Sequence, residues 1–287
     1  MLDLALSVLC SSLIFVIFKL YEIYKIETIY AIIANYVVAC SVGLFFYSGE
    51  VKPMEIAEKP WFLGTLLLGV LFIVVFNLMA KTSQAVGVSV ASVATKMSLV
   101  IPVVFGVLVY KESLGFLKIL GIVLALGAVY FTSIKKKEID IKRASLILPL
   151  LVFLGSGIID TSIKYVQETQ IKEEEFPLFS ATVFAAAAFA GFFLILFKAI
   201  KNPLRMNLKN VLGGIALGVP NYFSIFYLLR ALQNPTLNSA SVFTINNVAI
   251  VMLSTLLGII LFKEQISMKN WGGIVLAIIS ILLVAVF

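Results

Sequence analysis

The chain has 287 residues, of which 61% are hydrophobic and 13% are charged, and its mean hydropathy is +1.10. Soluble domains average about 45–50% apolar and about 25% charged residues, so this composition excludes an ordinary water-soluble fold. The net charge of +7 does not indicate nucleic-acid binding, because the basic residues lie mainly in short connections between apolar runs, where they act as topology determinants.

Ten apolar segments follow one another along the chain with little between them. A helix needs roughly 20 apolar residues to cross a bilayer core, and these segments are about that long and lack the alternation of membrane β-strands. We therefore predict an all-α integral membrane protein with ten transmembrane helices. The predicted spans are residues 2–20, 28–48, 60–80, 86–110, 114–133, 144–166, 176–198, 208–232, 236–262 and 267–287.

The fourth predicted span carries a lysine near its centre. Lys96 is equally far from the basic residues at the two ends of this span, which puts it close to the middle of the bilayer. A charge there costs about 2.5 to 3.5 kcal/mol on insertion scales, so Lys96 should face a polar interior, a partner or a ligand. Ser89 and Ser92 share its helix face, and Thr95 adjoins it.

Two interpretations of Lys96 remain open. In the first, its ammonium group anchors a carboxylate or another anionic group of a substrate, and Ser89, Ser92 and Thr95 belong to the same site. In the second, Lys96 is structural and bonds to backbone carbonyls or to a buried acid.

Asp160 is the only acid well inside a predicted span, the sixth. It precedes Lys164 by four residues, the favourable order for an acid and a base on one helix, so an ion pair with Lys164 is one interpretation. The other is a proton-coupling carboxylate or a counter-ion to Lys96. The position of Asp160 in the far part of its span argues against this second role.

Uncharged polar residues in the third, eighth and ninth spans are weaker candidates for a substrate site. Asn77 lies in the third span, Asn221 and Tyr222 follow a proline in the eighth, and Thr244 and Asn247 share a face of the ninth. Such side chains also hydrogen-bond between membrane helices for about 0.6 to 2 kcal/mol each, which is the alternative interpretation.

The two halves of the sequence resemble each other. Lys111-Glu112 is followed by GIVLA at Gly121, and Lys263-Glu264 is followed by GIVLA at Gly273, with the same separation. We therefore predict a five-helix repeat in residues 1–133, a basic connection in 134–143 and a second repeat in 144–287. An odd number of spans per repeat makes the two copies inverted, and inverted repeats commonly place a substrate site near the midplane between them.

These features resemble the drug/metabolite transporter superfamily, specifically its EamA-like ten-helix members. The resemblance covers essentially the whole chain and rests on the five-plus-five count, on Pro102 within SLVIPVVFGVLVYKESL, and on the Lys-Glu turn repeated in LLGIILFKEQIS. The ninth span departs from the pattern, because Ser254 stands where alignment with Pro102 would put a proline. A kink in the fourth span therefore need not be mirrored in the ninth.

Pairs of small residues four apart predict close helix contacts. We expect these residues to pack, and the fifth and tenth spans are candidates for contacts in a homodimer. The pairs are Gly121 with Ala125, Gly273 with Ala277, and Gly214 with Gly218.

Orientation is predicted differently by charge and by resemblance. Lys and Arg residues are more numerous in the odd-numbered connections, the first of which joins spans one and two, than in the even-numbered ones. The positive-inside rule then puts the odd connections in the cytoplasm and both termini outside. The family resemblance implies termini inside; we follow the charges.

The leading functional hypothesis is a secondary transporter in the plasma membrane, the inner membrane of a bacterium, working by alternating access. The resemblance implies small metabolites such as amino acids, often exported. We expect a cavity lined by spans three, four, eight and nine, no cofactor, no metal and no catalytic residue, because histidine is absent and no nucleotide-binding or zinc motif is present. The alternative is a non-transporting scaffold or assembly subunit, in which the buried polar residues only join helices.

Overall fold

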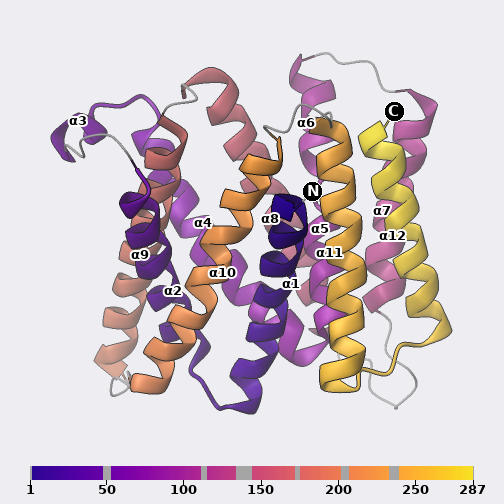
Figure 1. The fold of residues 1–287 in the computed structure, drawn as a ribbon, viewed down its shortest axis with the longest axis horizontal. Helices are drawn as coiled ribbons and strands as arrows, with labels where there is room; N and C mark the ends of the chain where they lie inside the picture. The colour runs from indigo at the N-terminus through magenta and orange to yellow at the C-terminus, as the bar shows by residue number, and fades with distance from the viewer. Residues whose placement is uncertain are drawn as a thin grey trace.

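The computed structural model describes residues 2–47, 53–110, 115–133, 144–171, 175–201, 207–232 and 239–286. Within these ranges the regular secondary structure is helical, without strands (Figure 1). The helices are α1 (Leu2–Ile23), α2 (Thr28–Phe45), α3 (Pro53–Ala57), α4 (Phe62–Ala85), α5 (Val88–Met97), α6 (Val100–Tyr110), α7 (Phe116–Ser133), α8 (Ala144–Thr169), α9 (Phe176–Lys201), α10 (Leu208–Leu232), α11 (Ser239–Phe262) and α12 (Met268–Val286).

Eight segments of the described chain are long and apolar enough to cross a membrane. One of them, Val88–Phe105, contains α5 and the first part of α6. Helices α7 and α12 supply two shorter apolar stretches, Ile119–Thr132 and Met268–Val284. Large apolar side chains are exposed on the molecule, for example Leu67 at 72%, and a bilayer would cover such a surface. The predicted all-α membrane architecture is confirmed, whereas the count of ten spans stays a prediction.

The fourth predicted span consists of two helices instead of one. Helix α5 ends at Met97 and α6 begins at Val100, with Ser98 and Leu99 between them. Pro102 has no N–H to bond the carbonyl group of Ser98 four residues earlier, and the N–H of Ile101 donates to that oxygen at 2.9 Å instead. The helix is therefore interrupted after Met97, one residue beyond Lys96. Helix α11, which has Ser254 at the corresponding position, is continuous.

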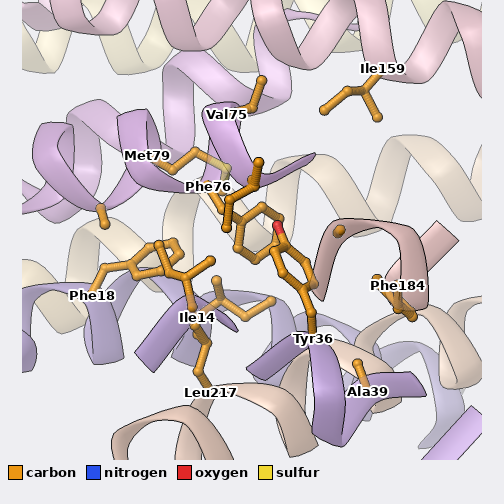
Figure 2. Close-up of a cluster of buried hydrophobic side chains, with 14 of the residues drawn as sticks. Ile14, Phe18, Tyr36, Ala39, Val75, Phe76, Met79, Ile159, Phe184 and Leu217 are labelled. Carbon is orange, nitrogen blue, oxygen red and sulfur yellow. The ribbon is translucent and has the colours of Figure 1, made fainter. Parts of the chain in front are cut away.

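Aromatic rings form the centre of the largest apolar core (Figure 2). The ring of Tyr36 on α2 lies 5.4 Å from Phe76 of α4 and 6.1 Å from Phe184 of α9, measured between centroids. The Tyr36 hydroxyl donates to the carbonyl oxygen of Phe72 at 2.8 Å. Because the hydroxyl is satisfied, Tyr36 is fully buried without leaving a polar group unpaired. This cluster fixes α2, α4 and α9 relative to one another.

The small-residue pairs lie at close helix contacts, as predicted. A Cβ atom at Gly121 of α7 would lie 2.7 Å from Val284 of α12, and one at Gly273 of α12 would lie 2.7 Å from the backbone nitrogen of Thr132 in α7. The Ser280 hydroxyl donates to the carbonyl oxygen of Gly121 at 2.7 Å across the same contact. Gly214 and Gly218 of α10 approach α2 in the same way. Spans five and ten thus pack against each other within one chain.

Figure 1 places both chain ends in its upper half and the α1–α2 and α11–α12 connections at its lower edge. Following the charges, we expect a reporter fused after Phe287 to be periplasmic or extracellular and one inserted in residues 134–143 to be cytoplasmic; both points lie outside the described residues. Reporter enzymes that are active on only one side of the membrane measure this. The reversed pattern would contradict the charge-based orientation.

Candidate functional site

A central cavity of about 400 Å³ lies between the two halves of the chain. Its wall combines a polar side with aromatic and aliphatic side chains. The polar lining residues are Ser11, Thr95, Lys96, Ser156, Asp160, Ser180, Asn221, Ser224 and Asn246. The apolar lining residues are Phe72, Val75, Phe76, Met79, Ile159, Ile163, Phe179, Val183, Phe184, Ile225 and Leu228. The predicted spans three, four, eight and nine all contribute, and α1, α8 and α9 contribute as well.

Lys96 faces this cavity from the last turn of α5. The C-terminal end of a helix carries a partial negative charge, which favours a cation at that position. The described part of the chain contains no ion pair of Lys96, although its ammonium group is within electrostatic reach of Asp160. The lysine is therefore available to a group that enters the cavity.

Asp160 faces the same cavity from α8. Its Oδ2 accepts a hydrogen bond from the Ser98 hydroxyl at 3.2 Å, at the break between α5 and α6. The ion pair with Lys164 that the spacing allows is not among the contacts of Asp160. Although Asp160 lies in the far part of its predicted span, it lines the same cavity as Lys96, because α8 packs beside α5 and α6. Its role as a counter-ion or coupling residue stays a prediction. A cation and an acid from different halves thus share one cavity.

Amide and hydroxyl groups form a hydrogen-bonded network on another part of the wall. The Asn221 amide nitrogen donates to Asn35 Oδ1 at 3.1 Å, which joins α10 to α2. The Ser7 hydroxyl lies 2.8 Å from the carbonyl oxygen of Ser224 and 3.2 Å from Asn246 Oδ1, which joins α1 to α10 and α11. These contacts satisfy buried polar groups and fix the helices around the cavity.

The predicted polar stripe on span four divides between two environments. Thr95 and Lys96 line the cavity. Ser92 instead accepts a hydrogen bond from the Ser254 hydroxyl at 2.6 Å, and the Ser89 hydroxyl donates to Glu264 at 2.7 Å. Ser89 and Ser92 therefore join α5 to α11 and its following turn, and they lie outside the cavity lining.

The remaining predicted site residues lie outside the cavity lining or outside the described side chains. The Asn77 amide donates to the carbonyl oxygen of Ile73 in its own helix at 2.7 Å. The Tyr222 ring stacks on Phe46 with centroids 5.9 Å apart. Asn247 is buried in α11, and Thr244 belongs to the same helix but its side chain is outside the described residues.

Several cavity residues are missing from the sequence-based prediction. Ser156 precedes Asp160 by one helical turn, so the spacing alone could have placed it on the same face. Its hydroxyl is buried and is one of three buried side-chain oxygens in the described residues without a hydrogen-bond partner. Phe72 and Phe76 share a face of α4 in the same way. Their apolar type gives no sign that they border a cavity.

An ion pair joins the two halves where α4 and α9 begin. Lys59 Nζ lies 2.7 Å from Glu175 Oε1, and the indole N–H of Trp61 donates to Glu175 Oε2 at 3.3 Å. Trp61 packs edge-to-face on Phe179, a cavity residue, with centroids 5.7 Å apart. The hydrogen bond to Glu175, and then its negative charge, raise the pKa of Lys59 above the usual lysine value.

Replacing Lys59 with glutamine should lower the melting midpoint at neutral pH by a small amount, since the ion pair is partly exposed to solvent, which screens it. A raised folded-state pKa means that the stabilisation is complete below the unfolded-state value, about 10.4, and is lost as pH rises through the folded-state pKa. The midpoints of the wild type and Lys59→Gln should therefore converge in the alkaline range. A gap that persists there would contradict the ion pair as its source.

Comparisons with known proteins support the same fold. The model of the EamA-like transporter family matches residues 1–134 and 144–286. An uncharacterized protein from Haemophilus influenzae (strain ATCC 51907 / DSM 11121 / KW20 / Rd) is 29% identical over 288 residues, which cover 97% of this chain and 96% of that protein. One crystal structure is 15% identical with a TM-score of 0.61, covering 98% of this chain and 94% of its own. That last likeness shows the fold alone.

Proposed function

The chain belongs to the EamA-like transporter family, and on this premise we propose that it is a secondary transporter that carries small amphipathic metabolites, such as amino acids, through the central cavity. The observation that carries the proposal is the pairing of Lys96 and Asp160 in one cavity without an ion pair between them. A carboxylate on the substrate binds Lys96, and an ammonium group on the substrate binds Asp160.

The apolar part of the wall suits the rest of such a molecule. Small-molecule sites are commonly about 300 to 1,000 Å³ in volume and mostly apolar, with a few polar groups that fix orientation. The cavity of about 400 Å³ falls in this range, and Phe72, Phe76 and Phe184 offer aromatic surface. An amino acid with an apolar side chain matches both the charges and the rings.

Alternating access gives the two halves their roles. The cavity lies where α4 and α5 of the first half meet α8, α9, α10 and α11 of the second, so a rocking motion of one half against the other would open it to either side. The Lys59–Glu175 pair joins the halves at one end of the bundle, and its opening would accompany that motion. We place the protein in the plasma membrane and propose export as the direction.

Ligand binding tests this proposal first. In a thermal-shift screen of purified protein, a ligand that binds only the folded state raises the melting midpoint by mass action. At a concentration a hundred times its Kd, such a ligand adds about 2.7 kcal/mol to the free energy of unfolding. We expect apolar amino acids to raise it and their decarboxylated amines to do so much less. Flux in reconstituted vesicles then measures transport and direction. If ligands bind the protein but none of them is carried across the vesicle membrane, the result would favour the non-transporting scaffold.

A further inference from the structure

The Lys263-Glu264 turn after α11 has a structural role that the proposed function leaves unused. Glu264 Oε1 accepts a hydrogen bond from the backbone N–H of Val88 at 2.6 Å, and Oε2 accepts one from the Ser89 hydroxyl at 2.7 Å. Both donors lie in the first turn of α5, where backbone N–H groups have no partner within the helix. A carboxylate at this end also complements the helix dipole. Glu264 therefore caps α5 from the other half of the chain.

Two glycines make room for this carboxylate. A Cβ atom at Gly258 of α11 would lie 2.6 Å from Glu264 Oε2, and one at Gly87 would lie 3.1 Å from Oε1. Gly87 also has a φ of 142°, a conformation that side-chain-bearing residues rarely adopt. The N–H of Glu264 donates to the carbonyl oxygen of Gly258 at 3.2 Å, which ties the acid to the end of α11. The carboxylate thus fits between α11 and α5, in the space that Gly258 and Gly87 leave open.

Helix α5 is held at this end and broken at the other. Its ten residues run from the Glu264 carboxylate to the break at Ser98. Between these two points, the Ser254 hydroxyl donates to the Ser92 hydroxyl at 2.6 Å. Lys96 sits in the last turn, next to the break. Since a helix moves as a rigid rod over so short a length, the anchored first turn sets where the last turn lies. Among the hydrogen bonds of the described residues, no other acid accepts one from the first turn of α5.

We propose that Glu264 is a positioning residue, which holds α5 against α11 so that the ammonium group of Lys96 stays in the central cavity. This inference rests on the proposed function, because it assigns Glu264 a role in the same site. It also gives the second copy of the Lys-Glu motif a physical task. The acid acts on the substrate site only through α5.

The first test needs no substrate. Formaldehyde with cyanoborohydride methylates lysine amines, and mass spectrometry gives the rate at Lys96 in detergent-purified protein. Glu264→Gln should raise that rate at least about threefold, because a released α5 samples positions outside its packed one. Lys263→Gln is the matched control, since it changes the neighbouring exposed charge without touching α5, and its rate should equal that of the wild type. An unchanged rate at Lys96 in Glu264→Gln would overturn the proposal.

A second variant covers the case in which Glu264→Gln does not fold. Gly258→Ala keeps every charge but places a methyl group against Oε2, which displaces the carboxylate from α5. It should raise the Lys96 methylation rate in the same direction. A folded Gly258→Ala with the wild-type rate would equally overturn the proposal.

The second test uses L-leucine as the probe and asks whether Glu264 acts through Lys96. Glu264→Gln should weaken L-leucine binding about tenfold in the wild-type background. In the Lys96→Met background the same change should have no further effect. Equal losses in both backgrounds would show a general structural role and overturn the positioning role. If L-leucine and the other amino acids fail to bind wild-type protein, the proposed function fails, and the methylation rates still decide whether Glu264 positions Lys96.

Discussion

Lys96→Met is expected to keep the fold and to lose ligand affinity. A charge-assisted hydrogen bond is worth about 1.5 to 3 kcal/mol, and each 1.4 kcal/mol is tenfold, so the affinity for a carboxylate ligand should fall roughly ten- to more than a hundredfold. Methionine keeps an unbranched chain of similar length and removes the cost of a charge in the membrane. The melting midpoint and the ligand affinity of the same purified variant measure the two effects.

The surroundings of Lys96 explain why the fold should survive. Removing one partner of a buried ion pair commonly costs about 3 to 5 kcal/mol, because the other charge is left uncompensated. Asp160 does not form such a pair with Lys96, keeps its hydrogen bond from Ser98, and is exposed to the cavity. The loss of Lys96 therefore leaves the acid with a partner and with access to water in the cavity.

Two controls separate the anchor from a structural lysine. The decarboxylated amine of the best amino-acid ligand should bind Lys96→Met no more weakly than it binds the wild type, since it has no carboxylate to lose. Thr95→Val changes the neighbouring cavity residue without changing charge and should have a smaller effect. A Lys96→Met protein that melts early but binds the amino acid normally would contradict the anchor.

Gly273→Leu should destabilise the protein strongly, whereas Gly272→Leu should not. A Cβ atom at Gly273 would lie 2.7 Å from the Thr132 backbone nitrogen and 3.0 Å from the Phe131 Cβ, while nothing lies within 4 Å of one at Gly272. Overpacking by single methylene groups costs about 1 to 3 kcal/mol, and leucine adds several against backbone that cannot move aside. We expect Gly273→Leu to lower the free energy of unfolding by at least about 3 kcal/mol.

The melting midpoint of each purified variant measures this difference. For this chain of 287 residues, at an unfolding entropy of about 2.1 cal/mol/K per residue, about 3 kcal/mol corresponds to a fall of roughly 5 °C. The adjacent glycine is a close control, because both variants add the same side chain to the same helix. A similar fall in both variants would mean that leucine acts through the bilayer or through helix propensity. A stable Gly273→Leu with lost flux would instead assign Gly273 a role in the transport motion.

Some features followed from the sequence because they depend on neighbouring residues alone. The apolar composition and the lengths of the apolar runs require membrane-spanning helices, whatever the packing between them. A lysine in the middle of such a run needs a polar environment, and the structure provides the cavity for Lys96. The small-residue spacing at Gly121 and Gly273 predicted close contacts in the same local way.

Only the tertiary structure decided which polar residues meet. Ser98 and Asp160 are 62 positions apart, Ser92 and Ser254 are 162 apart, and Val88 and Glu264 are 176 apart. Whether Ser92 faces the cavity or α11 depends on how two remote helices are rotated and shifted against each other, and helix periodicity fixes a shared face but not its neighbour. For that reason the sequence determined that Lys96 needs a polar cavity, and packing decided that Asp160 shares it and that Glu264 holds the helix that carries it.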